Sequence, residues 1–297
     1  MNYTHITVAG CGVLGSQIAF QTAFNDFRVS VYDISDEAIA QGKERIKKLQ
    51  ERYKEDLNAT DEQLDDALQR ISFHTDLSEA TKEADLLIEA VPELIEIKKE
   101  FYQELSQVAP EETVFASNSS TMIPSQLVSF VDRPEKFLML HFANEIWLNN
   151  TAEVMKHGAT NMDVFNDLIK FAEAINMIPL PIYKEQPGYI LNSLLVPYLD
   201  AAQYLLVNEI ADVETIDKTW MAATGSPRGP FATLDVIGIR TPYNLAVAKA
   251  EKGDEHKKKV ANYLKENYLD KGKLGIESGE GFYTYPNPRF KEVDFLT

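Results

Sequence analysis

The sequence feature that most constrains the fold is a glycine-rich turn near the amino terminus. Residues 6–9 form a short apolar stretch typical of a buried strand, and it leads directly into Gly10, Cys11, Gly12, Val13, Leu14 and Gly15. Residues 16–24 then carry apolar side chains at helical spacing. A second strand-like segment, 29–32, ends at Asp33, 18 residues after Gly15. This order is the fingerprint of a dinucleotide-binding βαβ unit.

Each glycine of the turn has a physical role in such a unit. Gly10 permits the tight turn, Gly12 lets the backbone approach a pyrophosphate, and Gly15 lets the helix pack closely on the strand. Val13 and Leu14 stand where the helix begins, and the N–H groups and positive dipole end at that point favour phosphate. A purely structural glycine turn is the alternative interpretation.

Asp33 predicts which dinucleotide is bound. Its carboxylate can accept hydrogen bonds from both hydroxyls of the adenosine ribose. A 2′-phosphate would instead meet that carboxylate, and at ~5 Å with an effective dielectric constant of ~20 each phosphate charge costs roughly 3 kcal/mol. The neighbouring Ile34 and Ser35 provide no compensating arginine. We therefore predict NAD(H) rather than NADP(H).

The pattern of the remaining chain predicts the fold class and two domains. Expected strands alternate with helical segments such as 94–108; these strands lie at 71–74, 85–91, 113–117, 137–142 and 178–182. Such alternation predicts a Rossmann-type α/β fold with a doubly wound parallel sheet. Residues 36–70, rich in charged side chains, predict an exposed helical hairpin that turns at 57–61. We expect an NAD-binding domain at 1–185 and a mainly α-helical domain at 186–297.

Charge excludes several classes of partner. The 297 residues hold 29 Lys and Arg against 46 Asp and Glu, a net charge of −17. Such a surface repels phosphate backbones and anionic lipids, so we predict no nucleic-acid and no membrane partner. The longest stretch without a charge, 113–131, is too polar to span a bilayer. With the single cysteine Cys11 and no recognisable signal peptide, a cytoplasmic location is expected.

Among the five histidines, His141 is the catalytic candidate. It lies near the carboxyl end of a predicted strand, where open α/β sheets bind ligands. The polar segment 117–121 also follows a strand end, and Glu153, 12 residues after His141, can return by a loop to bond the second imidazole nitrogen. A histidine base of this kind suits a dehydrogenase. A core histidine, capping serines at 117–121 and a surface Glu153 are the alternatives.

Motifs along nearly the whole chain resemble those of the L-3-hydroxyacyl-CoA dehydrogenases. Besides the glycine turn and Asp33, they lie at 89–93, 116–120, 140–142, 152–154, 187–192, 194–198 and 279–283. The resemblance implies that His141 is the catalytic base, with Glu153, Ser120 and Asn192 as its partners in the site. It also implies cofactor contacts from Glu93, Lys98, Asn118 and Asn144, no metal, a short-chain 3-hydroxyacyl substrate, and a homodimer formed through the helical domain.

The segment 141–153 is most similar to the diketoreductase branch of this family. Three positions where the family has basic side chains carry Asp56, Ser193 and Glu277, although a gap would move the first to Lys54. The alternative substrate is therefore a CoA-free β-keto or 3,5-diketo acid or ester. Arg228 stands in a loop where the family usually lacks arginine. Its two alternative roles are contact with a substrate carboxylate and a solvated surface side chain. A non-catalytic NAD-binding protein is the remote alternative.

The cofactor preference is directly testable by comparing NADH and NADPH at equal concentrations. A penalty of roughly 3 kcal/mol corresponds to about a hundredfold preference for NADH. Comparable turnover with the two cofactors would refute the role given to Asp33.

Overall fold

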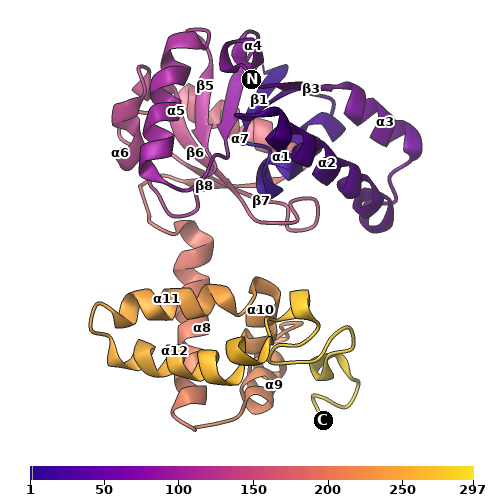
Figure 1. Cartoon of the computed structure of the whole chain (residues 1–297), viewed down its shortest axis with the longest axis vertical. Coiled ribbons are helices and arrows are strands. Elements are labelled where there is room, and N and C mark those ends of the chain that lie inside the picture. Colours follow the sequence, from indigo (N-terminus) through magenta and orange to yellow (C-terminus); the bar gives the residue numbers. More distant parts are fainter. Residues whose placement is uncertain (2) are drawn as a thin grey trace. The chain divides into compact units, whose positions relative to one another are not determined.

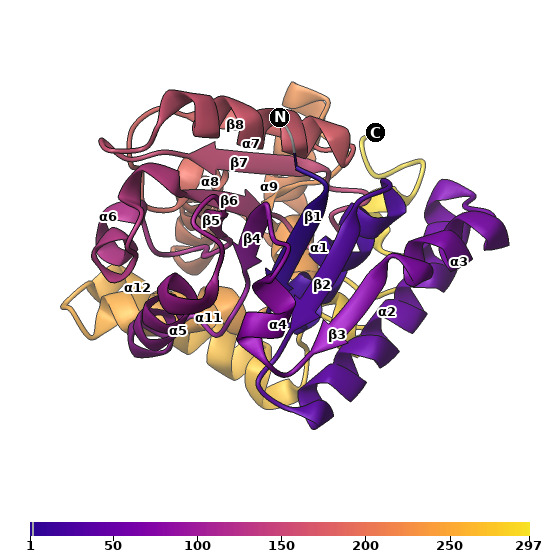
Figure 2. The ribbon, with the colours of Figure 1, turned by 90° about the horizontal axis from the view of Figure 1, so that it is seen from above.

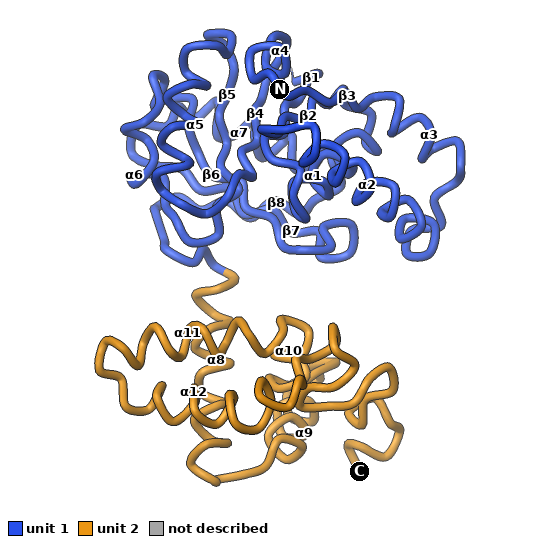
Figure 3. The backbone as a smooth tube through the Cα atoms, in the orientation of Figure 1, with its two compact units in different colours: residues 1–190 blue, residues 191–297 orange. Residues whose placement is uncertain are grey.

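The computed structural model describes residue 1 and residues 3–297. The described chain forms two compact units, residues 1–190 and residues 191–297, coloured separately in Figure 3. The division falls five residues beyond the boundary drawn from the sequence at 185. Each unit has its own apolar core.

Unit 1 is built on one eight-stranded sheet with the order β3-β2-β1-β4-β5-β6-β7-β8 (Figures 1 and 2). The strands are β1 (His5–Ala9), β2 (Arg28–Tyr32), β3 (Ile71–His74), β4 (Leu86–Glu89), β5 (Val114–Ser117), β6 (Phe137–Phe142), β7 (Thr151–Met155) and β8 (Ile178–Ile182). The first six are mutually parallel in the order of a doubly wound sheet, which confirms the predicted fold class.

Strand β7 is a correction to the sequence analysis. The segment containing Glu153 was expected to be a loop, but Thr151–Met155 pairs antiparallel with β6. Strand β8 then pairs parallel with β7, so these two strands run opposite to the other six. A glutamate in the middle of a short strand interrupts the apolar run that would have revealed it.

The central strands carry apolar side chains on both faces because helices cover both faces. In β6, Leu138 and Leu140 belong to one apolar cluster, whereas Phe137 and Met139 belong to the other. The first cluster includes side chains of α1 (Val13–Phe24) and α7 (Met162–Ala174). The second includes those of α4 (Leu77–Thr81), α5 (Ile95–Val108) and α6 (Pro124–Leu127). Such two-sided burial is typical of parallel strands.

The predicted helical hairpin consists of α2 (Asp36–Leu57) and α3 (Asp61–Gln69). The hydroxyl of Ser35 caps α2, and Asn58 ends it in the left-handed conformation, so the turn lies where the sequence placed it. The α2 side chains Ile46, Leu49 and Tyr53 are buried in the cluster that contains α1. The hairpin therefore packs against α1.

A second set of contacts joins α2 to the loop between β6 and β7. The indole N–H of Trp147 donates to Asp56 Oδ2 at 2.8 Å, and Arg52 binds both Asp56 (3.2 Å) and Glu145 (3.1 Å). The Trp147 ring packs on Tyr53, with ring centroids 5.4 Å apart. These contacts hold the loop that follows His141 against the hairpin.

Unit 2 is mainly helical, as the sequence predicted. Its helices are α8 (Tyr189–Val207), whose first two residues belong to unit 1, α9 (Val213–Thr224), α10 (Pro230–Ile237), α11 (Arg240–Ala250) and α12 (Glu255–Asn267). Across both units, the described residues also form the 3₁₀ turns η1 (Val128–Phe130), η2 (Pro134–Lys136), η3 (Leu269–Lys271), η4 (Ile276–Ser278) and η5 (Arg289–Lys291).

Helix α8 is long and apolar enough to cross a membrane by length and composition alone. In this structure it contributes Leu199, Ala202 and Leu206 to the core of unit 2. Its one charged residue, Asp200, forms ion pairs with Lys249 of α11 (3.0 Å) and Lys257 of α12 (2.5 Å). These contacts give α8 a packing role within the helical unit.

Buried Asp235 explains the glycine motif near the carboxyl terminus. Its carboxylate accepts the N–H groups of Phe282 and Tyr283, each at 2.8 Å. A Cβ at Gly281 would lie 2.0 Å from Asp235 Oδ1, so a side chain there is excluded. Burial raises the pKa of Asp235 to about 6. This part of the motif has a structural role.

We predict that Trp147→Phe lowers the free energy of unfolding by about 1 kcal/mol or more, because the smaller phenyl ring cannot donate the hydrogen bond to Asp56. The measurement is the thermal unfolding midpoint of this variant, of Asp56→Ala and of the double variant. The double variant should lose less than the sum of the single losses.

The matched control is Trp220→Phe at the chain's other tryptophan, which is 41% exposed. Strictly additive losses at Trp147 and Asp56 would contradict the contact.

Candidate active site

Two side chains on neighbouring strands form the centre of the site. His141 of β6 and Glu153 of β7 stand directly opposite each other in the antiparallel register. His141 Nδ1 lies 3.0 Å from Glu153 Oε2, and the two residues are only 7% and 2% exposed. The partner of His141 is therefore a cross-strand neighbour and not a residue returning by a loop. A carboxylate at Nδ1 favours the tautomer that leaves Nε2 as the basic nitrogen.

The loop after β5 places a hydroxyl on the other side of the imidazole. Ser120 Oγ lies 3.0 Å from His141 Nε2. Asn118 ties the start of this loop to β4 and to β6, since its N–H donates to the Glu89 carbonyl (2.8 Å) and its Oδ1 accepts the Phe142 N–H (3.0 Å). The predicted convergence of 117–121 and His141 on one edge of the sheet is what the structure contains.

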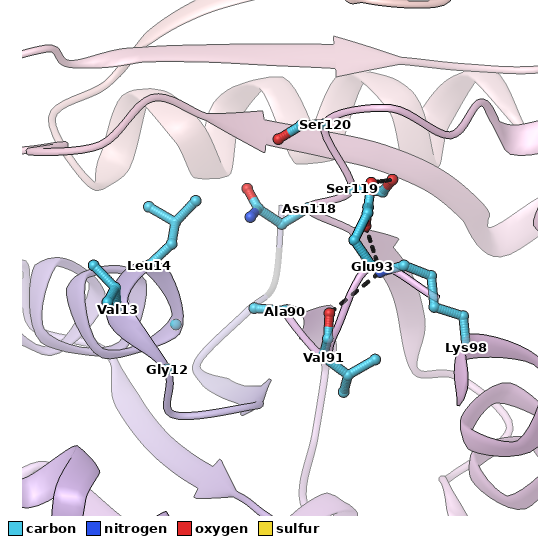
Figure 4. A pocket seen from close by; sticks show the side chains of 11 residues that line it. Gly12, Val13, Leu14, Ala90, Val91, Glu93, Lys98, Asn118, Ser119 and Ser120 are labelled. Carbon is cyan, nitrogen blue, oxygen red and sulfur yellow. Dashed lines mark hydrogen bonds and ion pairs between the residues drawn. The ribbon is translucent and has the colours of Figure 1, made fainter. Parts of the chain in front are cut away.

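A cavity of about 200 Å³ lies beside this loop (Figure 4). It is lined by Gly12, Val13, Leu14, Gly15, Ala90, Val91, Glu93, Lys98, Asn118, Ser119 and Ser120. No side chain caps the amino terminus of α1 in the described structure, and its first residues, Val13 and Leu14, line the cavity. The first N–H groups of the helix therefore have no side-chain acceptor. Free N–H groups at a helix start suit a phosphate.

The glycines of the turn fit a bound dinucleotide. Gly10 has φ +96°, and a Cβ there would lie 2.5 Å from the Ala90 carbonyl oxygen. A Cβ on Gly15 would lie 1.9 Å from the Gly10 carbonyl oxygen, so the helix packs closely as predicted. A Cβ on Gly12 would meet no atom within 4 Å, so this glycine leaves the space before the helix open. These residues fit NAD, with its pyrophosphate at the start of α1.

A second cavity of about 500 Å³ shares Gly12, Ala90 and Val91 with the first and extends toward Asp33. Asp33 Oδ2 accepts the Cys11 N–H (2.8 Å), so this carboxylate also fixes the glycine turn. Glu100 and Glu104 lie in the same lining, which within the described chain contains no lysine or arginine. The three carboxylates in the lining of this second cavity disfavour a 2′-phosphate.

A buried ion network lies beneath the first cavity. Lys98 Nζ lies 2.5 Å from Glu89 Oε1 and 3.1 Å from Glu93 Oε2, and both Lys98 and Glu89 are almost fully buried. Glu89 Oε2 also accepts the hydroxyls of Ser117 (2.6 Å) and Tyr102 (3.1 Å). Every oxygen of this buried carboxylate is thus paired, as a buried charge requires.

Glu93 connects this network to the loop after β5, which carries Ser119 and Ser120. It accepts the Ser119 hydroxyl (Figure 4). It also accepts the Thr121 hydroxyl at 2.8 Å. Burial opposes ionisation, but the Ser119 hydrogen bond and the Lys98 charge together lower the pKa of Glu93 below its usual range. Sequence reasoning named Glu89 only within a motif. The available signal was an acidic residue ending a buried strand with a lysine nine positions later.

The remaining predicted residues have separate locations. Asn144 is exposed in the β6–β7 loop, where its carbonyl accepts an N–H of Asn149 (2.8 Å). Asn192 lies in α8 within unit 2. Their roles remain predictions. In the described residues no group of His, Cys, Asp and Glu side chains could hold a metal ion.

The nucleotide cavity reaches Ser120, which contacts the oriented His141, and this arrangement is that of an NAD-dependent oxidoreductase. Residues 5–186 match the family model for the 3-hydroxyacyl-CoA dehydrogenase NAD binding domain, and residues 188–285 match that for the 3-hydroxyacyl-CoA dehydrogenase C-terminal domain. The chain belongs to the 3-hydroxyacyl-CoA dehydrogenase family.

Three similar proteins cover nearly the whole chain. Human mitochondrial hydroxyacyl-coenzyme A dehydrogenase is 32% identical over 95% of this chain and 91% of its own. A probable 3-hydroxybutyryl-CoA dehydrogenase of Bacillus subtilis is 32% identical over 96% and 98%. A solved diketoreductase structure, described for its dual catalysis of dicarbonyl compounds, is 50% identical with a TM-score of 0.92, covering 96% of this chain and all of its own.

We predict that Lys98→Met destabilises unit 1 by about 3 kcal/mol or more, because Glu89 is left as an unpaired buried charge. Thermal unfolding of Lys98→Met and of Lys98→Met combined with Glu89→Gln measures this. The second substitution should recover much of the loss.

The matched control is Lys136→Met, which breaks an ion pair with Glu112, a side chain 91% exposed. It should cost less than about 1 kcal/mol. Equal losses for the two lysine variants would contradict the buried network.

Proposed function

We propose that this protein interconverts a hydroxyl and a ketone at C3 of a β-hydroxyacyl compound, with His141 as general base and acid. The observation that carries the proposal is the hydrogen-bonded series Ser120, His141 and Glu153 beside the nucleotide cavity. A non-catalytic NAD-binding protein needs the glycine turn and Asp33 but has no use for this series.

The geometry supports a simple path for the proton. In the oxidation direction, the hydroxyl proton passes to His141 Nε2 as hydride leaves C3. Bound NAD supplies the acceptor for that hydride, and its reduced form supplies the donor in the reverse direction. Glu153 at Nδ1 stabilises the imidazolium that forms, and Ser120 orients the reacting oxygen. In reduction, the imidazolium returns its proton to the ketone oxygen.

The leading substrate class is a short-chain 3-hydroxyacyl-CoA. Its support is the match of both domains to the family and the relatives named for hydroxyacyl-CoA and 3-hydroxybutyryl-CoA. We further propose a cytoplasmic homodimer formed through unit 2, without nucleic-acid or membrane partners. Apolar side chains exposed on unit 2, such as Leu194 (69%) and Tyr204 (50%), are suited to that role.

A second candidate is a CoA-free β-keto or 3,5-diketo compound. It is favoured by the 50% identity to the diketoreductase. The side chains at the positions where the family has basic residues also favour it, because CoA phosphates require available basic groups. Asp56 accepts the Trp147 indole, Lys54 binds Asp61 at 2.7 Å, and Glu277 faces Arg240 at 4.0 Å.

We predict that His141→Gln lowers turnover by at least about a hundredfold, the usual contribution of a positioned acid–base group. NADH binding should be retained, because the glutamine does not touch the glycine turn. Steady-state rates and NADH fluorescence titration measure the two properties.

The matched control is His157→Gln, another buried histidine, whose Nε2 lies 3.0 Å from the Pro134 carbonyl. It should leave turnover within about twofold. Unchanged turnover in His141→Gln would overturn the mechanism.

NADH oxidation with acetoacetyl-CoA and with a matched free ester of acetoacetate distinguishes the substrate classes. We expect turnover of the thioester. Turnover of the ester with none on the thioester would select the CoA-free candidate, and turnover of neither would contradict both.

A further inference from the structure

The first two residues of α8 contact both members of the His141–Glu153 pair, within unit 1. The ring of Tyr189 stacks on the imidazole of His141, with centroids 4.4 Å apart and planes inclined by 20°. The N–H of Ile190 donates to Glu153 Oε1 at 2.8 Å. One short segment therefore holds the histidine ring by its face and the carboxylate by its second oxygen.

The phenol of Tyr189 makes a third contact with the site. Its hydroxyl donates to the Ser119 carbonyl at 2.6 Å, one residue before Ser120. Tyr189 is fully buried. Burial, followed by the charges of Glu153, Glu93 and Glu89, raises the pKa of its phenol. The hydroxyl therefore stays protonated and keeps its role as a donor.

The backbone at this point is unusual for a bulky residue. Gly188 has φ +80°, and Tyr189 itself has φ +56°. The left-handed region is unfavourable for a side chain with a Cβ, so a tyrosine there indicates that the surrounding contacts impose it. The Tyr189 N–H donates to the Gln186 carbonyl (3.0 Å), which fixes the turn that directs the ring toward His141.

We propose that Tyr189 is a positioning residue for the proton-transfer step. This inference rests on the proposed function, in which His141 carries the proton. The ring fixes the imidazole plane so that Nε2 faces Ser120 and the reacting oxygen, and the hydroxyl fixes the loop that carries Ser120.

The test is a double-mutant cycle between Tyr189 and His141, measured as kcat, KM and NADH dissociation constant. Tyr189→Leu removes the stack and the hydroxyl and should lower kcat by about tenfold or more, since small misplacements of a catalytic group have such effects. Tyr189→Phe keeps the stack and should recover most of that loss. NADH affinity should stay within about twofold in each variant.

The His141→Gln background separates positioning from simple structural support. There, Tyr189→Leu should lower the residual rate much less than it lowers kcat in the otherwise intact enzyme, because the imidazole is gone and only the hydrogen bond to the loop of Ser120 remains to be lost. The matched control Tyr53→Phe removes another buried tyrosine hydroxyl, which bonds Gln21 away from the site, and should leave kcat unchanged.

Two results would overturn the proposal. One is an equal loss of kcat from Tyr189→Leu in both backgrounds. The other is unchanged kcat for both Tyr189 variants in the otherwise intact enzyme, whether or not their thermal unfolding midpoints fall. If His141→Gln alone left turnover intact, the proposed function would fail instead, so the two failures are distinguishable.

Discussion

The hydrogen bond between His141 Nδ1 and Glu153 Oε2 is the interaction around which the active-site edge of the molecule is organised. It exists because β7 reverses direction and pairs antiparallel with β6, which makes the two residues direct neighbours across the strands. Side chains in such a pair stand close enough to bond without any loop adjustment. Ser120 and Tyr189 then contact the imidazole at Nε2 and on its face, and the Ile190 N–H donates to the second carboxylate oxygen of Glu153.

The same edge of the sheet shows how an acidic protein holds an anionic cofactor. Its net charge of −17 does not govern the nucleotide site, because the phosphate-binding groups there are backbone N–H groups at the start of α1. The one lysine in the first cavity, Lys98, is committed to Glu89 and Glu93. Through Glu93, Lys98 links the end of β4 to the loop that carries Ser119 and Ser120. The surface charge therefore affects which substrate can bind, and it affects NAD binding much less.

Local patterns were sufficient to predict the elements that depend on local sequence. The glycine turn, the positions of the first six strands and the hairpin turn at Asn58 follow from spacing and capping residues. Strand β7 was missed because its buried Glu153 is stabilised by His141 and by the distant Ile190 N–H, which are tertiary contacts. The Glu89–Lys98 pair and the left-handed Tyr189 likewise depend on neighbours that no local pattern reveals.

In the proposed mechanism, His141 Nε2 and Ser120 Oγ together bind the oxygen that gains or loses a proton. Its most direct test is an experimental structure of the ternary complex with NAD and a 3-keto ligand. We predict the ketone oxygen within about 3.2 Å of both His141 Nε2 and Ser120 Oγ, the range of a catalytic hydrogen bond. A well-ordered ligand whose ketone oxygen is held elsewhere, with His141 bonded only to protein groups, would contradict it.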